Sequence, residues 1–478
     1  MTDSPLTSKQ APIITPKNSS TILRIANAIL TFCFILFTLA YAFSISLTQA
    51  AAYAGVAAWL GQTHFTHSWN KTKLILIWPI GLFFLASVLS VVTAVDPALS
   101  LSGLKKLFKA IIFFWVMNAL ALTRPLGFFA DLSQRLKLSK LRNYIEARTR
   151  SLKNVSSLAI LLSIMIIAGT LSAAYGIFQG LAQPPFYPWA PESWSEFVRR
   201  DIWSRFGVHG SLSNIMTYSV ILMLIACLVL ARIIFDPRTS KKILIGALVI
   251  LGGAMMLTLI RQAWLGLFVA AIFLLFIRKR VLVLIPVFAV GLIVLLGPPA
   301  LTERIKSITD LQQNSNSERI LLLKAGWDVF KDYPLTGCGF KCLFVVADQY
   351  PEHPILQSFK HLHNNIEQIA VDTGAIGLCA WLSIWVVYFV QLIRRSRQIP
   401  PDANVRWVVF GSAAAVIAFL VAGMFENSFY DSEIIILVYF IMALPFVDTN
   451  TSQSAPSEST AHLHSGSDLR GRNPAQGS

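Results

Sequence analysis

Charged residues are scarce in this chain. They make up 13% of its 478 residues, against about 25% in a soluble domain, while hydrophobic residues make up 55%. A chain with so little charge cannot present a water-compatible surface over its whole length. The composition therefore excludes an ordinary soluble enzyme and predicts an all-α polytopic membrane protein.

Cysteine is also rare, and its five residues form no disulfide framework. Cys33, Cys227 and Cys379 fall in apolar runs, where we expect packing roles. Cys338 and Cys342 lie in a polar segment, and a bridge between them needs both an oxidising compartment and tight local geometry. We expect two free thiols there, with a disulfide and a zinc pair as the alternatives.

The N-terminus lacks the features of a cleaved signal peptide. A polar stretch over 1–20 is followed by an apolar run that is too long for an h-region. We expect a cytoplasmic tail over 1–20 and a first membrane helix that is retained.

Apolar runs near the length of a membrane span, roughly 20 residues, recur along the chain. We predict about twelve membrane helices, nine over 21–297 and three over 366–447. The runs lie near 22–41, 43–60, 74–93, 104–122, 156–180, 210–235, 243–260, 262–277, 281–297, 366–393, 408–425 and 433–447.

Lysine and arginine predict the orientation. A cytoplasmic N-terminus places most of them inside, including a basic cluster within 124–153. This topology accounts for most of the net charge of +16, so we predict no nucleic-acid partner. The polar segment 298–365 then lies outside, between helices 9 and 10. Residues 448–478, rich in Ser, Thr, Gly and Pro, are predicted to form a disordered cytoplasmic tail.

The outside segment is predicted to contain an amphipathic helix of its own. Ser317 is the expected N-cap, followed by Glu318 in the first turn. Pro334 and Gly337 are expected to end the helix. Such a helix would lie on the membrane surface or roof a cavity.

Histidines and amides end the outside segment, in the run His361-Leu362-His363-Asn364-Asn365. Histidine exchanges a proton near neutral pH, so a catalytic base is one reading and an interfacial cap is the other. If the histidines open a helix, positions i and i+2 do not share a face, and one is catalytic while the other is structural. As metal ligands the pair is weak, because no third ligand is evident. Glu367 is a candidate to orient a histidine.

Arginines near the outer membrane boundary are the second group of interest. Arg261 interrupts two apolar runs, and such a guanidinium is usually paired or functional, although snorkelling to the headgroups is the alternative. A phosphate is its natural partner, since arginine offers a bidentate fork. Arg199, Arg200 and Arg205 lie in a tryptophan-rich belt, which is either an anchor or a phosphate site. We favour Arg205, because Gly207 and Gly210 follow it.

Several motifs in the second half of the chain resemble the O-antigen ligase / O-antigen polymerase superfamily. Arg261-Gln262-Ala263-Trp264 resembles its Arg-x-x-Trp helix end. The other matching stretches are Asn316-Ser317-Glu318-Arg319, Tyr333-Pro334-Leu335-Thr336-Gly337-Cys338-Gly339, His361-Leu362-His363-Asn364 and Gly374-Ala375-Ile376-Gly377-Leu378.

The resemblance implies a GT-C-like, metal-independent glycosyltransferase without cofactor in the bacterial inner membrane, with 298–365 as a periplasmic catalytic loop. The donor would be a glycan on undecaprenyl pyrophosphate, and the acceptor a sugar of the lipid A–core. The base would be His363 or His361, supported by Asn364 and Glu367. Arg261 and Arg205 would bind the phosphates.

Other functions remain open from the sequence. An O-antigen polymerase would use the same donor with a growing glycan as acceptor, and a protein O-oligosaccharyltransferase would modify proteins instead. A membrane transporter is the non-enzyme alternative. It predicts ionisable residues near the middle of the membrane, whereas here they gather at the predicted outer boundary.

Overall fold

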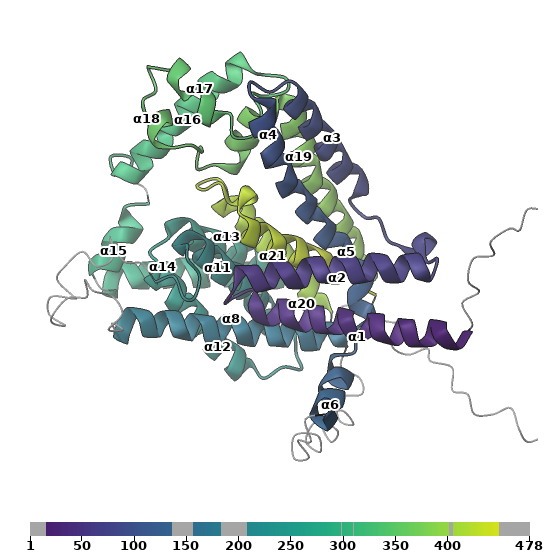
Figure 1. Ribbon diagram of the computed structural model, residues 1–478. Coiled ribbons are helices and arrows are strands. Elements are labelled where there is room, and N and C mark those ends of the chain that lie inside the picture. The colour runs from purple at the N-terminus through teal and green to yellow at the C-terminus, as the bar shows by residue number, and fades with distance from the viewer. Residues whose placement is uncertain are drawn as a thin grey trace, which may run out of the picture.

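The structure is a computed structural model that describes residues 16–135, 156–182, 208–297, 299–308, 310–400 and 405–448. Within these residues the regular secondary structure is helical throughout (Figure 1). The first half of the described chain contains α1 (Pro16–Ala40), α2 (Ile45–Phe65), α3 (Ile77–Val92), α4 (Pro97–Leu104), α5 (Ile111–Ala119), α6 (Pro125–Arg135), α8 (Ser157–Ala182) and α11 (Ile215–Phe235). The second half contains α12 (Lys241–Leu257), α13 (Arg261–Arg278), α14 (Leu284–Leu296), α15 (Pro299–Lys306), α16 (Asn314–Asp332), α17 (Leu343–Val346), α18 (Ile355–Ser358), α19 (Asn365–Gln398), α20 (Arg406–Ala422) and α21 (Ser432–Ala443).

The main core is centred on α11, which packs against α12, α13 and α20. Its sequence is apolar on all sides, and its side chains are buried along most of its length. A second contact joins α3 to α19, and a third joins α1 to α2. The two halves of the chain are therefore packed into one bundle.

The bundle has the surface of a multi-pass membrane protein. Five helices of the described chain are long and apolar enough to cross a membrane: Leu23–Ala40, Ser157–Gly180, Ile215–Phe235, Arg261–Arg278 and Asn365–Gln398. Four shorter apolar helices accompany them. Each of the twelve predicted runs coincides with helix, but the number that spans stays a prediction.

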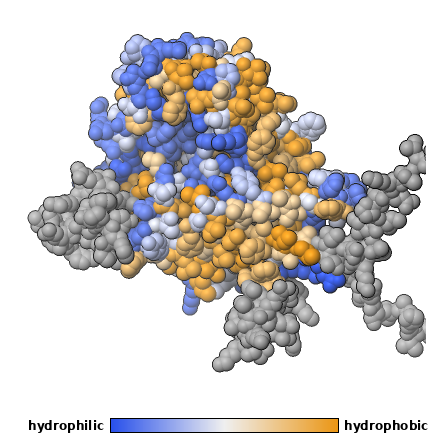
Figure 2. All heavy atoms as spheres, in the orientation of Figure 1, coloured by the Kyte–Doolittle hydropathy of each residue, from blue (hydrophilic) through white to orange (hydrophobic). Residues whose placement is uncertain are grey.

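Large apolar side chains on the outside of the bundle are suited to lipid. On α14, Phe288 and Leu295 are 73% and 79% exposed, which is costly in water and favourable in hydrocarbon. Figure 2 shows apolar side chains over the body of the molecule, whereas hydrophilic ones gather at the upper left, over α15 to α18. The hydrophilic segment is the part predicted to lie outside.

The described residues of the segment 298–365 form a lobe, and its part from α16 onward has a small core of its own. Leu322, Val329, Leu343 and Leu356 are buried in it, together with Leu362 at its end. In Figure 1, α16, α17 and α18 of the lobe lie near the upper ends of α3 and α19, whereas α15 lies lower, beside α14, and α16 packs on α19. A polar segment with a core can hold its side chains in fixed positions.

The amphipathic helix of the lobe, α16, starts earlier than predicted. It begins at Asn314 and is preceded by Gln313, so the expectation that Ser317 caps it is wrong. The Ser317 hydroxyl instead donates to the Asn314 carbonyl within the first turn, at 2.9 Å. The C-terminal end, at Asp332 just before Pro334, agrees with the prediction.

A kink in α19 fits the lobe onto the bundle. Gly374 interrupts the helix with φ 64° and ψ −171°, a conformation suited to glycine. The freed N–H of Ala375 donates to the Pro334 carbonyl at 2.8 Å, and that of Ile376 donates to the Leu335 carbonyl at 3.2 Å. The end of α16 is thereby tied to the middle of a membrane helix.

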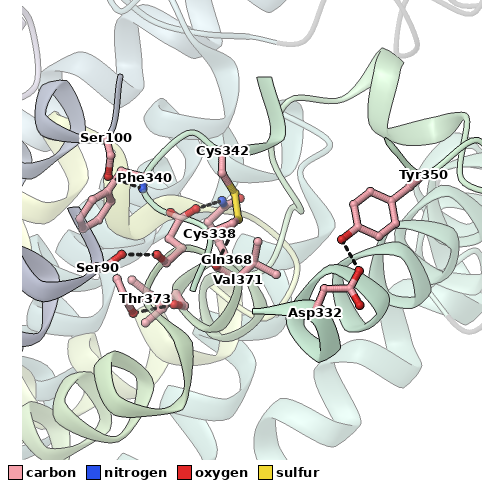
Figure 3. Close-up of a disulfide and its surroundings, with 12 residues drawn as sticks. Ser90, Ser100, Asp332, Cys338, Phe340, Cys342, Tyr350, Gln368, Val371 and Thr373 are labelled. Atoms are coloured by element: carbon pink, nitrogen blue, oxygen red, sulfur yellow. Dashed lines mark hydrogen bonds between the residues drawn. A yellow bond between two sulfur atoms is a disulfide. The ribbon is translucent and has the colours of Figure 1, made fainter. Parts of the chain in front are cut away.

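Cys338 and Cys342 form a disulfide, so the expectation of two free thiols is wrong. Their Cα atoms are 5.7 Å apart, within the usual range for a bridge. The left-handed backbone of Gly339 and Lys341, with φ 96° and 62°, bends the loop enough to bring the two sulfurs together. Figure 3 shows the bridge beside Val371 of α19.

Candidate active site

The two histidines stand on a short non-helical stretch before α19, so the case considered from the sequence, in which they open a helix, does not apply. α19 begins at Asn365, and His363 has a φ of 50°. Between them, Leu362 is 1% exposed and anchored in the core of the lobe. Both imidazole rings therefore come together, with centroids 4.1 Å apart.

His363 is paired with a carboxylate that lies far away in the sequence. Its Nδ1 is 2.9 Å from Oε2 of Glu426, and both side chains are mostly buried. Glu426 belongs to the turn between α20 and α21. A carboxylate on Nδ1 fixes the orientation of the ring and stabilises the imidazolium, as it does in hydrolytic triads.

Asn365 holds the turn of Glu426 against the histidines. Its N–H donates to the Gly423 carbonyl at 2.7 Å, and its Oδ1 accepts from the Phe429 N–H at 2.9 Å. A Cβ at Gly423 would lie within 2.1 Å of the Asn365 amide, so only glycine allows this approach. Asn365 therefore brings together two parts of the chain that each supply one member of the pair.

His361 is held in its neutral form. Burial lowers the pKa of His361 below its usual 6.5, the charge of His363 lowers it further, and Glu426 acts weakly in the opposite direction. Its Nδ1 is buried with no hydrogen-bond partner among the described residues. A neutral imidazole beside a hydrogen-bonded one is suited to accept a proton.

Glu426 is held in its charged form. Burial on its own raises the pKa of the carboxyl, but the hydrogen bond from His363 and the charge of His363 act against burial, and the pKa is lowered from its usual 4.5. Its Oε1 also accepts from the Asn427 N–H at 3.2 Å. The carboxylate is therefore a permanent anion at neutral pH.

The same three residues offer donor atoms to a metal. The ligand atoms of His361, His363 and Glu426 all lie within 4.8 Å of one another. Catalytic zinc sites also have three protein ligands. The His363–Glu426 contact, however, is a hydrogen bond that an ion would have to break. The expectation of a metal-independent site stays a prediction, which chelation tests.

A cavity of about 140 Å³ lies next to the turn of Glu426. Three arginines line it, Arg261, Arg304 and Arg319, and none of its described lining residues is acidic. Phe425, which directly precedes Glu426, forms part of its wall. A cluster of guanidinium groups without carboxylates is a site for an anion.

Arg261 supports the cavity by holding a loop of the lobe. Its Nη1 donates to the carbonyl and hydroxyl of Ser307 at 2.6 and 3.0 Å. Its Nη2 donates to the Ser315 hydroxyl and to Asn316 Oδ1. Asn316 in turn donates to the Ser307 carbonyl at 2.9 Å. The terminal N–H groups of Arg261 are thus used within the protein, while its charge remains in the cavity.

Arg319 links the cavity to the histidine pair, because its Nε donates to the Phe425 carbonyl at 3.1 Å. Arg304 donates through Nε to the Leu259 carbonyl at 3.4 Å, and its two terminal nitrogens make no hydrogen bond to the described residues. Burial lowers the pKa of both arginines, an effect that Glu426 partly offsets at Arg319. Both remain charged at neutral pH.

The structure places the remaining sequence candidates as follows. Asn364 caps α19, accepting from the backbone N–H of Ile366 at 2.9 Å. Glu367 contacts Gly326 of α16, and none of the hydrogen bonds of the described residues joins it to a histidine. Arg205 lies outside the described residues, as do Arg199 and Arg200.

Sequence reasoning did not single out Glu426, Arg304 or the role of Arg319. Glu426 lies between two apolar runs, in a position much like that of Arg261, and this was the available signal. Arg319 belongs to one of the motifs quoted for the family resemblance, but the sequence indicates no role of its own for it. Nothing in the spacing along the chain indicates that Arg304 and Arg319 share a cavity.

A comparison with protein families matches residues 246–382 to the family described as O-antigen ligase. No curated protein matches the chain. The matched residues include both histidines and all three arginines of the cavity, whereas Glu426 lies beyond them. This similarity over residues 246–382 confirms the resemblance to the O-antigen ligase / O-antigen polymerase superfamily.

Proposed function

We propose that the protein is an O-antigen ligase, which transfers a glycan from undecaprenyl pyrophosphate to a hydroxyl of the lipid A–core. The family domain supports a glycosyltransferase of the ligase and polymerase kind. The observation that carries the proposal is the His363–Glu426 pair beside a cavity lined by three arginines. This arrangement provides a base and an anion site a short distance apart.

Each group has a role in the proposed reaction. The acceptor oxygen attacks the anomeric carbon of the donor glycan, and the bond from that carbon to the phosphate oxygen breaks. The acceptor proton passes to a histidine, for which His363 is the better candidate because Glu426 stabilises the resulting imidazolium. The leaving diphosphate keeps the bonding electrons, and its charge is stabilised by the arginines.

We propose that the site faces the periplasm of a bacterial inner membrane. The distribution of lysine and arginine supports this orientation. The Cys338–Cys342 bridge supports it as well, because disulfides persist in oxidising compartments and the bridge lies in the same lobe as the histidines. A reporter fused after Asn364 tests the orientation, and a cytoplasmic signal would contradict the proposal.

The decisive experiment is surface-polysaccharide analysis of a deletion strain, complemented by the wild type or by His363→Ala. A ligase defect leaves an undecorated core and intact polymer on the carrier. A polymerase defect leaves a core that carries single repeat units. Normal lipopolysaccharide with unglycosylated periplasmic proteins would indicate a protein O-oligosaccharyltransferase, and either of the last two results would contradict ligation.

A further inference from the structure

A second and larger cavity, of about 360 Å³, also borders the turn that contains Glu426. His361 and Glu426 line it, whereas the preceding residue, Phe425, lines the arginine cavity. The backbone between Phe425 and Glu426 therefore separates the two cavities. Of the cluster of His361, His363 and Glu426, the first and the last therefore border the larger cavity directly.

The carboxylates around the larger cavity are occupied by internal partners. Asp372 accepts from the Gln368 amide at 3.0 Å, and Asp431 accepts from the Thr217 hydroxyl at 2.5 Å and caps α21. Glu426 is bonded to His363. The lining contains as many acids as lysines. Because the acids already accept hydrogen bonds within the protein, they have few free lone pairs for a ligand.

The three lysines of the lining contact no carboxylate of the described residues, although Asp372 and Asp431 attract the charge of Lys106 from beyond contact distance. Lys341 Nζ donates to an uncharged group, the Ser102 hydroxyl, at 2.9 Å. Lys106 Nζ lies over the ring of Tyr430, 5.4 Å from its centre. Among the described residues no carboxylate forms an ion pair with these two or with Lys360. Their ammonium groups remain available to an anionic ligand.

The remaining wall suits a sugar. Phe344, which is 57% exposed, provides an apolar side chain, and Asn214 and Asn427 provide amides. A pyranose has C–H faces and a rim of hydroxyls, so it matches a mostly polar wall that also contains aromatic side chains. The cavity is also large enough to hold a saccharide unit, since ligand pockets begin at about 300 Å³.

The disulfide loop fixes this wall in place. Phe340 and Lys341 lie between Cys338 and Cys342, and the Cys338 N–H donates to the Val371 carbonyl at 3.0 Å. The Phe340 N–H donates to the Ser100 hydroxyl at 2.9 Å, as Figure 3 shows. The loop is thus closed covalently and held on both sides, so its two cavity residues keep their positions.

We infer that the larger cavity binds the acceptor glycan and that it selects an acceptor carrying anionic substituents, phosphate or carboxylate, near the hydroxyl that reacts. The inference rests on the proposed function, because it takes the arginine cavity for the donor diphosphate. A sugar in the lysine cavity then presents a hydroxyl to the histidine pair through His361, which lines that cavity. Donor and acceptor enter by separate cavities and meet at the histidines.

The test uses the purified full-length protein with a glycan on undecaprenyl pyrophosphate as donor and lipid A–core as acceptor. Lys106→Gln, Lys341→Gln and Lys360→Gln are each expected to raise the acceptor KM about tenfold, equivalent to about 1.4 kcal/mol, with the donor KM within about twofold. Lys331→Gln is the matched control, because this lysine of α16 pairs with Asp328 on the exposed face. An unchanged acceptor KM, or a raised donor KM, would overturn the inference.

Two further arms identify the anion. If phosphate is recognised, removal of phosphates from the acceptor is expected to abolish the difference in acceptor KM between wild type and lysine variants. If carboxylate is recognised, reduction of the carboxyl groups of the acceptor is expected to abolish it. A difference that survives both treatments contradicts anion recognition.

Binding measured without donor separates this inference from the proposed function. The wild type is expected to bind lipid A–core, and the three lysine variants are expected to bind it about tenfold more weakly. Lysine-dependent binding without any transfer would contradict the proposed reaction and support the assignment of the larger cavity to the acceptor. Transfer combined with lysine-independent binding would contradict the assignment of the larger cavity to the acceptor and leave the proposed function intact.

Discussion

His363 Nδ1 lies 2.9 Å from Glu426 Oε2, although 63 residues separate them in the chain. Asn365 makes this contact possible by bonding to the Gly423 carbonyl and the Phe429 N–H. With Nδ1 engaged, Nε2 of His363 is the nitrogen left for a substrate. The geometry assigns Glu426 as a positioning residue and His363 as the base.

His363→Ala is expected to lower the rate of glycan transfer by about 10²–10⁴-fold, because a general base contributes about that factor. Protein level in the membrane is expected to stay normal. His64→Ala is the control, since this histidine is exposed at the end of α2. Transfer at the wild-type rate by His363→Ala would contradict its role.

Glu426→Gln keeps the size of the side chain and removes its charge. We expect kcat to fall, by up to about 10⁴-fold, while both KM values change little, because the carboxylate acts on the imidazole and not on a substrate. Glu426→Asp is expected to recover part of kcat. Steady-state kinetics with both substrates varied measures this split, and a loss confined to KM would refute the positioning role.

Arg261→Lys and Arg304→Lys separate loop support from phosphate binding. Arg261 bonds to Ser307, Ser315 and Asn316, which a single ammonium cannot do, so its variant is expected to lose both thermal stability and most transfer. Arg304→Lys is expected to raise the donor KM with little change in melting temperature, because its terminal nitrogens hold no described residue. If the two variants changed melting temperature and donor KM in the same way, the assignment of loop support to Arg261 and of phosphate binding to Arg304 would be wrong.

Gly337→Ala is expected to destabilise the protein by more than about 1 kcal/mol. Its φ is 73°, and a Cβ there would come within 2.4 Å of the Asp372 backbone. Gly291→Ala is the matched control, because a Cβ at that helical position meets nothing within 4 Å and is expected to stabilise by about 0.5–1 kcal/mol. Thermal unfolding in detergent compares the two, and equal midpoints would refute the steric account.

Acid is expected to destabilise the site through His361. Its pKa is lowered below 6.5 in the folded protein, so on acidification the unfolded chain takes up this proton first. The contribution of neutral His361 to the stability of the folded protein is therefore full above pH 6.5. It is lost as the pH falls below 6.5, towards the pKa of the folded protein. His361→Gln is expected to reduce the loss of melting temperature between about pH 7.5 and about pH 5.5. Equal losses in both proteins would contradict burial of the ring.

Chelation tests the metal-independent prediction. EDTA is expected to leave the transfer activity of the purified protein unchanged, because the hydrogen-bonded His363 and Glu426 provide the base without an ion. The same assay after addition of zinc or magnesium gives the control. Activity that EDTA removes and a divalent ion restores would turn the cluster of His361, His363 and Glu426 into a metal site.

The sequence by itself determined the class of the protein and most of its helices. Low charge and repeated apolar runs leave a membrane bundle as the outcome, because apolar side chains in this number can be satisfied only by lipid and by one another. The residues His361, His363 and Arg261 could also be selected, since polar groups are conspicuous between apolar runs.

Only the tertiary structure decided how these residues work. The partner of His363 is not the nearby Glu367 but Glu426, and Arg304 and Arg319 join Arg261 in one cavity. The Cys338–Cys342 bridge depends on the backbone conformation of Gly339 and Lys341. Such contacts arise where the lobe folds back onto the bundle, and hydropathy along the chain carries no information about which turns meet there.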